Sequence, residues 1–467
     1  MPWSQITNIK GPPGEKGEAG LANGSFSKLL SSHLDLYVST TGDDTTGDGT
    51  ELLPWASPHR AMRELFAYII TPEASATVHI ADGQYTFSEP LEIGHPNGER
   101  IKVLGGSVGS SKPSSSELTG NAETGNTAGS LAFNDAVLAG YYNTRWQFNA
   151  PQALLCTSGN GVTLDQILVR GAGQTTKAGL VLKGGAVNLG INYSGNVAFC
   201  NCSLGVEVAA RSLKAPGIQV ANCNTGLSVS GGRAELDSLV VANCSEQGID
   251  CSGGYLQAMT ATSQRNGSSG VRAYGTAVVE FSYSNCSFNN GDGIEARGAA
   301  AVTANSSKLR NQTRSGALVS GSASVSLDSA QVSGNQMNGL SAGEHATLSA
   351  GYGQILSNGQ VGLSVSGCAT VKAAGASISS HPQVGVSVNG PAYLDAFGAT
   401  ISSNTGGGVS IQQGGTAYLV QASLYGNGGT GIKVQGDGYV DFTGGDPSVT
   451  LSPAANTLGN GRGYISR

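Results

Sequence analysis

The sequence predicts an all-β protein, a right-handed parallel β-helix with three short strands in each coil of about 23 residues. Three observations support this fold class. Glycine accounts for 71 of 467 residues while charged residues make up only 12%, which excludes helical and coiled-coil proteins. A glycine-centred motif recurs at nearly constant spacing. Between its copies, apolar and polar residues alternate, as in strands with one buried face.

The repeat unit is Asn-x-x-x-Gly-(Val/Ile/Leu)-x-(small apolar), as at Asn266 to Ala273. Its glycine falls at 226, 248, 270, 293, 316, 339, 362, 385, 408 and 431, two steps of 22 followed by seven of 23. Two rows of apolar residues have the same spacing of 23. The first is Val279, Val302, Val325, Leu348, Val371 and Leu394, and the second is Leu309, Val332, Ile355, Ile378, Ile401 and Leu424. Such short coils leave no room for a helix, so each coil's strands must pair with those of the next coil. We expect the right hand from the handedness of strand crossovers.

One polar row also follows the repeat. It consists of Asn266, Asn289, Asn335, Asn358, Asn404 and Asn427, with Gln312 and His381 in the gaps. We interpret it as a structural ladder, in which each Asn adopts left-handed backbone geometry at a corner and hydrogen-bonds to its stacked neighbour. The alternative is a row of ligand-binding side chains. The glycine that follows is expected to form the tight corner.

Residues 1–34 differ from the repeat. Glycine occupies every third position between Gly11 and Gly20, the spacing that a collagen triple helix requires. This predicts a short three-chain stem and therefore a homotrimer. A flexible Pro/Gly linker is the alternative.

Residues 35–150 are predicted to form an N-terminal module. Ser57-Pro58 is a helix start before Ala61, Met62, Leu65, Phe66 and Ile69, which have helical spacing. This helix is expected to cap the open end of the coil stack. Residues 107–130 are expected to form an exposed loop. The regular β-helix is predicted over 151–445, followed by a C-terminal tail over 446–467.

Bulk charge and hydropathy exclude several partners. The net charge is −6 with no basic cluster, which argues against nucleic acid and anionic membranes. No apolar run reaches the roughly 18 residues that a membrane-spanning helix needs. The start, Met1 to Gln5, lacks the features of a signal peptide, so we expect synthesis in the cytosol.

Acidic side chains occur at outward positions of the predicted strands, and glycan hydrolysis uses paired carboxylates. Asp250 and Glu295 lie two coils apart, about 9.6 Å, a separation compatible with an inverting pair. Arg272 lies between them and is expected to pair with both, which indicates a surface charge ladder. If the protein is an enzyme, the candidate catalytic residues are Glu207, Asp237, Asp250, Glu280 and Glu295.

Exposed aromatic side chains are the usual platforms for sugars. Tyr393, Tyr418 and Tyr439 are predicted to form an outward ladder in the last coils, which could also be a subunit contact or a stabilising cross-strand stack. Tyr141, Tyr142 and Trp146 form a second candidate glycan-binding group in an irregular segment, with a buried cap as the alternative.

The eight cysteines are expected to remain reduced. Cys202, Cys223 and Cys244 recur at steps of 21, so they stack, but parallel side chains have the wrong torsion for a disulfide. No paired Cys-x-x-Cys motif is present and the six histidines are scattered, so we predict neither a metal site nor a cofactor.

Several segments resemble a known group of proteins. Tyr37 to Asp43, Pro54 to Ser57 and Ile80 to Gly83 resemble the opening of pectate-lyase-like β-helix proteins. With Trp3 to Ile6 and the collagen-like triplets ahead of them, most of the chain resembles a bacteriophage tail fibre or tailspike at the level of architecture. The Gly-His-Gly signature of polygalacturonases is absent from the sequence.

This resemblance implies a place and a role. The N-terminus, residues 1–34, would attach a homotrimer to a phage tail or baseplate protein, and the β-helix would meet host surface polysaccharide. The protein would then be part of the virion tail, assembled in the host cytoplasm. We favour host attachment without required catalysis. The alternative is a tailspike glycan depolymerase, either a hydrolase or a lyase, that uses the outward carboxylates.

Overall fold

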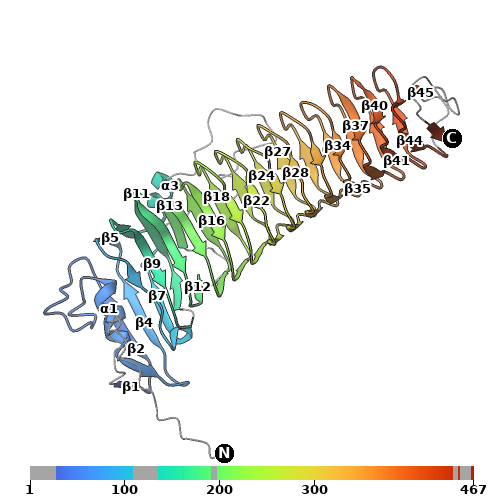
Figure 1. Cartoon of the computed structure of the whole chain (residues 1–467). Coiled ribbons are helices and arrows are strands. Elements are labelled where there is room, and N and C mark those ends of the chain that lie inside the picture. The colour runs from blue at the N-terminus through green and yellow to red at the C-terminus, as the bar shows by residue number, and fades with distance from the viewer. Residues whose placement is uncertain are drawn as a thin grey trace, which may run out of the picture.

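The protein is an elongated rod of stacked coils (Figure 1). The computed structural model describes residues 28–108, 135–160, 162–190, 197–444, 451–452 and 464–466. It is a parallel β-solenoid of about 14 turns. The collagen-like triplets, most of the 107–130 segment and most of the C-terminal tail lie outside the described residues.

Three parallel ladders of strands run along the rod, and each regular coil contributes one strand to each ladder, as predicted. The first ladder follows the repeat glycine; its strands are β6 (Leu91–Glu92), β9 (Gln152–Cys156), the second halves of β11 (Ile167–Leu182) and β13 (Val197–Val208), β16 (Thr225–Val229), β19 (Ile249–Cys251), β22 (Val271–Ala273), β25 (Ile294–Ala296), β28 (Ala317–Val319), β31 (Leu340–Ala342), β34 (Leu363–Ser366), β37 (Val384–Asn389), β40 (Gly407–Gln412), β43 (Ile432–Val434) and β45 (Leu451–Ser452).

The second ladder reaches both ends of the rod. Its strands are β2 (Leu34–Val38), β4 (Ala76–Ile80), β7 (Ile101–Leu104), β10 (Val162–Asp165), β12 (Val187–Leu189), β14 (Ser212–Ala215), β17 (Arg233–Leu236), β20 (Tyr255–Ala258), β23 (Val278–Glu280), β26 (Ala301–Thr303), β29 (Ser324–Ser326), β32 (Thr347–Ser349), β35 (Thr370–Lys372), β38 (Tyr393–Asp395), β41 (Thr416–Tyr418), β44 (Tyr439–Asp441) and β46 (Tyr464–Ser466).

The third ladder completes each coil. Its strands are β5 (Gly83–Phe87), β8 (Thr144–Phe148), the first halves of β11 and β13, β15 (Ile218–Ala221), β18 (Leu239–Ala242), β21 (Thr262–Gln264), β24 (Asn285–Ser287), β27 (Lys308–Arg310), β30 (Gln331–Ser333), β33 (Gln354–Leu356), β36 (Ser377–Ser379), β39 (Thr400–Ser402) and β42 (Ser423–Tyr425).

Strand register follows the sequence repeat. Val279 pairs with Val302, and Leu309 with Val332, each 23 residues away. The middle residue of such a three-residue strand points inward when its neighbours point outward, so a one-residue slip would expose the core. The repeat spacing therefore determines the pairing of the coils.

The inward rows form one continuous hydrophobic core from Leu30 to Phe442. The N-terminal module shares this core, because β2, β4 and β7 begin the same second ladder that continues through β44 to β46. Most core side chains are Val, Leu, Ile and Ala, and full burial of each of the larger ones contributes about 1.5–3 kcal/mol.

The Asn row is a buried hydrogen-bond ladder. Asn266 donates from its backbone N–H and from Nδ2 to Asn289 Oδ1, at 3.0 and 2.9 Å. Asn335 Nδ2 likewise donates to Asn358 Oδ1 at 2.8 Å. These contacts support the structural interpretation, because the amides are occupied by one another inside the rod.

The backbone geometry of this row differs from the prediction. The left-handed residue is the one before each ladder position, for example Arg265 with φ 53° and Ser357 with φ 50°. The ladder Asn side chains instead point inward, where the amide satisfies backbone groups of the neighbouring coils.

The repeat glycine is required by close approach and not by left-handed geometry. A Cβ on Gly339 would lie 2.5 Å from Gly362 O, 2.5 Å from Ile355 Cγ2 and 2.8 Å from Asn358 Nδ2. A side chain at this position would therefore push adjacent coils apart.

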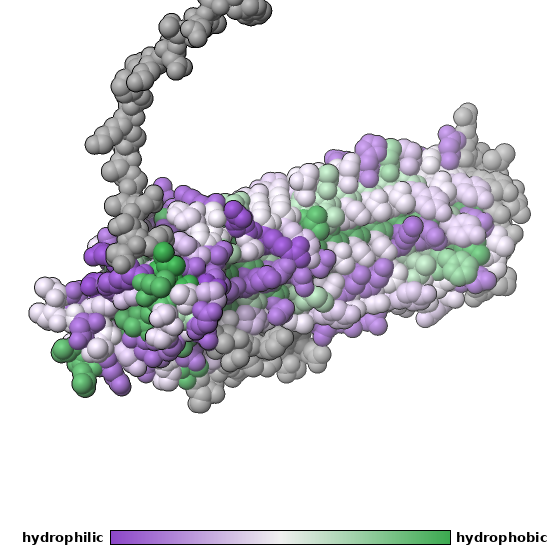
Figure 2. Space-filling view, turned by 90° about the horizontal axis from the view of Figure 1, so that it is seen from below, coloured by the Kyte–Doolittle hydropathy of each residue, from purple (hydrophilic) through white to green (hydrophobic). Residues whose placement is uncertain are grey.

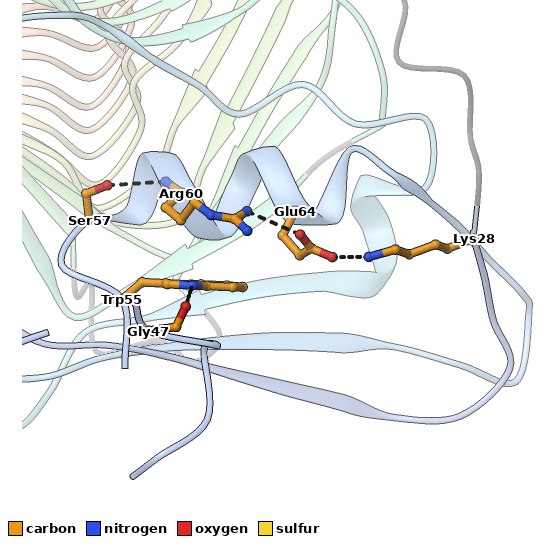
Figure 3. A network of polar contacts seen from close by, with 6 residues as sticks. All are labelled: Lys28, Gly47, Trp55, Ser57, Arg60 and Glu64. Carbon is orange, nitrogen blue, oxygen red and sulfur yellow. Dashed lines mark hydrogen bonds and ion pairs between the residues drawn. The ribbon is translucent and has the colours of Figure 1, made fainter. Parts of the chain in front are cut away.

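The predicted N-terminal helix is present as α1 (Pro58–Leu65). Ser57 Oγ accepts a hydrogen bond from Arg60 N at 3.2 Å, which is the expected N-cap (Figure 3). The helix ends at Leu65, so Ile69 lies beyond it in β3 (Tyr68–Ile70), which pairs with β1 (Lys28–Leu30). Figure 3 shows Glu64 between Arg60 and Lys28, which ties the helix to β1. The helix lies at the N-terminal end of the rod (Figure 1), and its capping role stays a prediction.

Two further short helices occur in the described residues. A 3-10 turn, η1 (Gly98–Arg100), precedes β7. The helix α3 (Asp135–Tyr141) lies outside the third ladder, where Leu138, Tyr141 and Tyr142 pack on outward apolar residues including Leu168 and Val240.

Candidate functional site

Three exposed tyrosines lie on the outer side of the second ladder near the C-terminal end of the rod. Tyr393, Tyr418 and Tyr439 are 41%, 38% and 38% exposed. We call this surface the tyrosine face. It belongs to β38, β41 and β44, which lie at the end opposite α1 in Figure 1.

The predicted order of the tyrosine face is wrong in one position. Tyr393 pairs with Thr416, and Thr416 pairs with Tyr439, so two tyrosines share a row with a threonine between them. Tyr418 lies in the other outward row, where it pairs with Asp395 and Asp441. The cause is the register: Ala417 pairs with Leu394 and Val440, whereas Leu419, which is also buried, lies two residues further along the chain.

The surroundings of the tyrosine face are polar and fixed. Asp395 Oδ1 accepts a hydrogen bond from Phe397 N at 3.1 Å, and Asp441 Oδ1 accepts one from Thr443 N at 3.0 Å. Partial burial raises the pKa of Tyr393, with smaller contributions from Asp395 and Tyr418. The Tyr393 phenol thus remains a neutral donor at physiological pH, in a surface whose carboxylates accept hydrogen bonds.

The second group of candidate glycan-binding aromatics is buried. These rings cannot contact a large sugar, so the prediction of a glycan-binding site here is wrong. Tyr142 and Trp146 are 0% exposed and Tyr141 is 5% exposed. Trp146 lies in the core against Phe87, with ring centroids 6.3 Å apart. Tyr141 and Tyr142 attach α3 to the rod, and burial raises the pKa of Tyr142. The buried cap is therefore the better interpretation of this segment.

The five candidate carboxylates are divided between two faces. Glu207, Asp250 and Glu295 follow the outward row of the first ladder, in the predicted register through Ser228 and Arg272. Glu280 lies on the second ladder at the end of β23, and Asp237 lies just after β17 of the same ladder. The structure does not bring the five groups together.

Arg272 pairs with one carboxylate and not with both. Its Nε lies 2.7 Å from Asp250 Oδ1. Glu295 instead pairs with Arg297 at 2.6 Å and accepts a hydrogen bond from Ser269 Oγ at 2.8 Å. The expected bridge is replaced because Arg297 follows two residues after Glu295, on the same outer side of the coil.

Asp292 is a titratable residue that the repeat pattern did not reveal. Its side chain is 2% exposed, and its Oδ1 accepts a hydrogen bond from Ser315 N at 2.9 Å. Burial raises its pKa. A carboxyl so deeply covered cannot contact a polymer on the rod surface, so we assign it a structural role. The feature of the sequence that could have revealed Asp292 is its place in the motif, one residue before the repeat glycine.

The remaining chemistry of the described residues is limited. All eight cysteines are free thiols, seven of them buried, and desolvation raises the pKa of Cys251 to about 12. Within the described ranges, no cluster of three or more His, Cys, Asp or Glu side chains suits a metal ion. The same ranges contain no helix with the length and hydropathy for crossing a bilayer.

Comparison with known proteins concerns the fold. The family described as right handed beta helix region matches residues 248–395. Among solved structures, the A-module of Azotobacter vinelandii mannuronan C-5 epimerase AlgE4 is 11% identical over 84% of this chain and 89% of its own, with a TM-score of 0.32. Pectate lyase Pel9A is 13% identical over 93% of this chain and 82% of its own, with a TM-score of 0.25.

A viral protein is also similar. Geobacillus virus E2 ORF18 is 9% identical over 79% of this chain and 54% of its own, with a TM-score of 0.31. No curated protein matches the sequence. The match over 248–395 coincides with the most regular coils, and the rod is a right-handed parallel β-helix.

Proposed function

We propose that the protein is a phage tail fibre or tailspike component that binds host-cell surface polysaccharide through the tyrosine face. The observation that supports this most directly is the set of three half-exposed tyrosines on one side of the rod. The apolar face of a sugar ring packs on an aromatic ring, while its hydroxyl groups hydrogen-bond to adjacent polar groups.

The scaffold suits recognition of a repeating polymer. Each tyrosine is presented by a strand that pairs with strands above and below, so little conformational freedom is lost on binding. Strongly hydrophilic residues become sparse toward the C-terminal end of the side shown in Figure 2. Such a surface favours contacts through rings and hydroxyl groups over ion pairing.

The other end of the rod would serve attachment. In this proposal residues 1–34 hold a homotrimer to a tail or baseplate protein through the collagen-like stem, and α1 covers the first coils. The glycine triplets and the packing of Ala61, Met62 and Leu65 against the rod support this arrangement. The protein would then reside in the virion tail after assembly in the host cytoplasm.

The experiment is a binding and size assay with purified host-surface polysaccharide. Tyr393→Ala and Tyr439→Ala are expected to weaken binding about tenfold or more, the loss of roughly 1.4 kcal/mol. Tyr283→Ala is the matched control, because Tyr283 is an exposed tyrosine in a turn far from this surface. Equal binding by all variants would refute the proposal. Shortened polysaccharide chains would support the depolymerase alternative instead.

A further inference from the structure

A second concave surface lies at the N-terminal end of the rod. A cavity of about 500 Å³ is formed between the 42–54 loop and the first strands of the second ladder. Its lining includes Tyr37, Ser39, Thr41, Glu51, Leu52 and His79. We call it the N-terminal pocket. Its volume is in the range of small-molecule sites, and the tyrosine face lies at the other end of the rod.

Backbone hydrogen bonds hold the pocket wall in place. Tyr37 N donates to Gly49 O at 2.9 Å, and Ser39 N donates to Trp55 O at 2.8 Å. Trp55 is buried beneath the loop, and its Nε1 donates to Gly47 O at 2.9 Å (Figure 3). The Arg60 guanidinium lies 4.7 Å from the centroid of the Trp55 ring. The loop is thus anchored to both β2 and α1.

The acidic residues of the loop stabilise its turns. Asp43 Oδ1 accepts hydrogen bonds from Thr45 N and Thr46 N, at 2.7 and 3.0 Å. Asp44 Oδ1 accepts from Ala56 N at 2.8 Å. The pocket is therefore formed before any ligand arrives, which reduces the entropy cost of binding.

One side of the pocket is an aromatic platform. The rings of Tyr37 and His79 stack with centroids 4.8 Å apart and planes 18° apart. Asp35 Oδ1 lies 2.8 Å from His79 Nε2, which fixes the orientation of the imidazole. Both residues line the pocket, and the ring surface that the stacked pair leaves open can pack on one face of a pyranose ring.

The opposite side combines apolar and polar groups. Leu52 is 91% exposed on an otherwise ordered loop, so its apolar side chain is available to cover a ligand. Glu51 accepts no hydrogen bond from the residues that the structure describes. The hydroxyl groups of Ser39 and Thr41 lie 3.0 Å apart. These groups match the alternating C–H and O–H rim of a sugar ring, and the charge of Glu51 disfavours an acidic sugar.

We propose that the N-terminal pocket binds a single neutral pyranose unit, independently of the tyrosine face. Tyr37 and His79 would form the platform, Leu52 would cover the ring, and Glu51 would accept hydrogen bonds from its hydroxyl groups. The site adds a monosaccharide-sized contact at one end of the rod to the polymer contact at the other.

The test uses the full chain and a panel of methyl glycosides of glucose, galactose, mannose and N-acetylglucosamine, with glucuronic acid for comparison. Binding is measured by saturation-transfer NMR and titration calorimetry. At least one neutral glycoside is expected to bind saturably. Tyr37→Leu and Glu51→Ala are each expected to weaken that binding about tenfold or more.

Matched variants separate this pocket from other effects. Glu246→Ala removes an exposed carboxylate elsewhere and should leave glycoside binding unchanged. Tyr393→Ala should weaken polysaccharide binding but not glycoside binding, so each proposal can fail alone. The pocket proposal is overturned if no neutral glycoside binds, if glucuronic acid binds more tightly, or if the Tyr37 and Glu51 variants bind as the parent does.

Discussion

Asn335 provides the sharpest test of the buried amide ladder. Its side chain is 1% exposed and makes three hydrogen bonds. Oδ1 accepts from Gln312 N at 3.0 Å, while Nδ2 donates to Leu309 O at 3.2 Å and to Asn358 Oδ1 at 2.8 Å. Asn335→Ala removes all three hydrogen bonds, because the alanine methyl group has no polar atom to replace them.

The magnitude follows from the partners left behind. A buried donor such as Gln312 N–H costs about 1–3 kcal/mol when it loses its acceptor. Each of the other two hydrogen bonds contributes about 0.5–1.5 kcal/mol. The free energy of unfolding should therefore fall by about 2–6 kcal/mol, among the larger effects of single substitutions.

Denaturant unfolding, followed by circular dichroism, measures the loss. Because solenoid coils can unfold in groups, hydrogen exchange with mass spectrometry should accompany it. Faster exchange is expected first in the coils around β27, β30 and β33, which contact Asn335 or its partners.

Two further variants test the reasoning. Asn335→Gln should retain much of the stability, because Gln312 already occupies this row and its Oε1 accepts from Asn289 N at 2.9 Å. Asn389→Ala changes an exposed Asn and should change stability by less than about 0.5 kcal/mol. If Asn335→Ala is as mild as Asn389→Ala, the ladder does not stabilise the rod.

Three more predictions follow from the same coils. Desolvation lowers the pKa of His381, whose Nδ1 accepts from Asn358 N, so stability should fall as pH drops below about 6.5. His381→Asn should reduce this loss in thermal melts across pH, while the part due to buried His59 and His95 remains. Gly339→Ala should lower the melting temperature because its Cβ would meet three atoms within 2.8 Å, whereas Gly140→Ala, with nothing within 4 Å, should not. Iodoacetamide should modify Cys368 alone in the native protein, as seen by mass spectrometry, because the other seven thiols are buried.

Each of these has a contradicting result. An unchanged acid transition in His381→Asn would place the titrating group elsewhere. Equal melting temperatures for Gly339→Ala and Gly140→Ala would mean that the coils can separate at little cost. Rapid alkylation of Cys251, whose pKa is raised to about 12, would show that the rod opens locally.

The repeat made the fold predictable. A period of 23 residues with apolar alternation already specifies coil length, strand number and register, since a one-residue slip would expose Val302 or Val332. The helix start at Ser57 was also readable, because an N-cap depends on local sequence alone. These features involve contacts that recur at constant spacing or lie within a few residues.

The candidate sites were less predictable. Whether Tyr142 is buried depends on α3 folding back over the third ladder, a contact between distant segments. Tyr418 lies in the other row because Ala417, and not Leu419, pairs with Leu394 and Val440, a register set by the stacking of the coils. Arg272 pairs with Asp250 alone because Glu295 pairs with Arg297, a residue that the predicted outward row did not include.

By itself, then, the sequence determined the coil, the parallel ladders and the stacking of the amide row, because these repeat with the chain. Only the tertiary structure decided which aromatic rings reach solvent, which residue of each corner is left-handed and where the 42–54 loop closes on Tyr37 and His79. Those outcomes depend on contacts between segments with no common period. Side-chain volume and hydrogen-bond partners, which are known only once the coils are stacked, settle them.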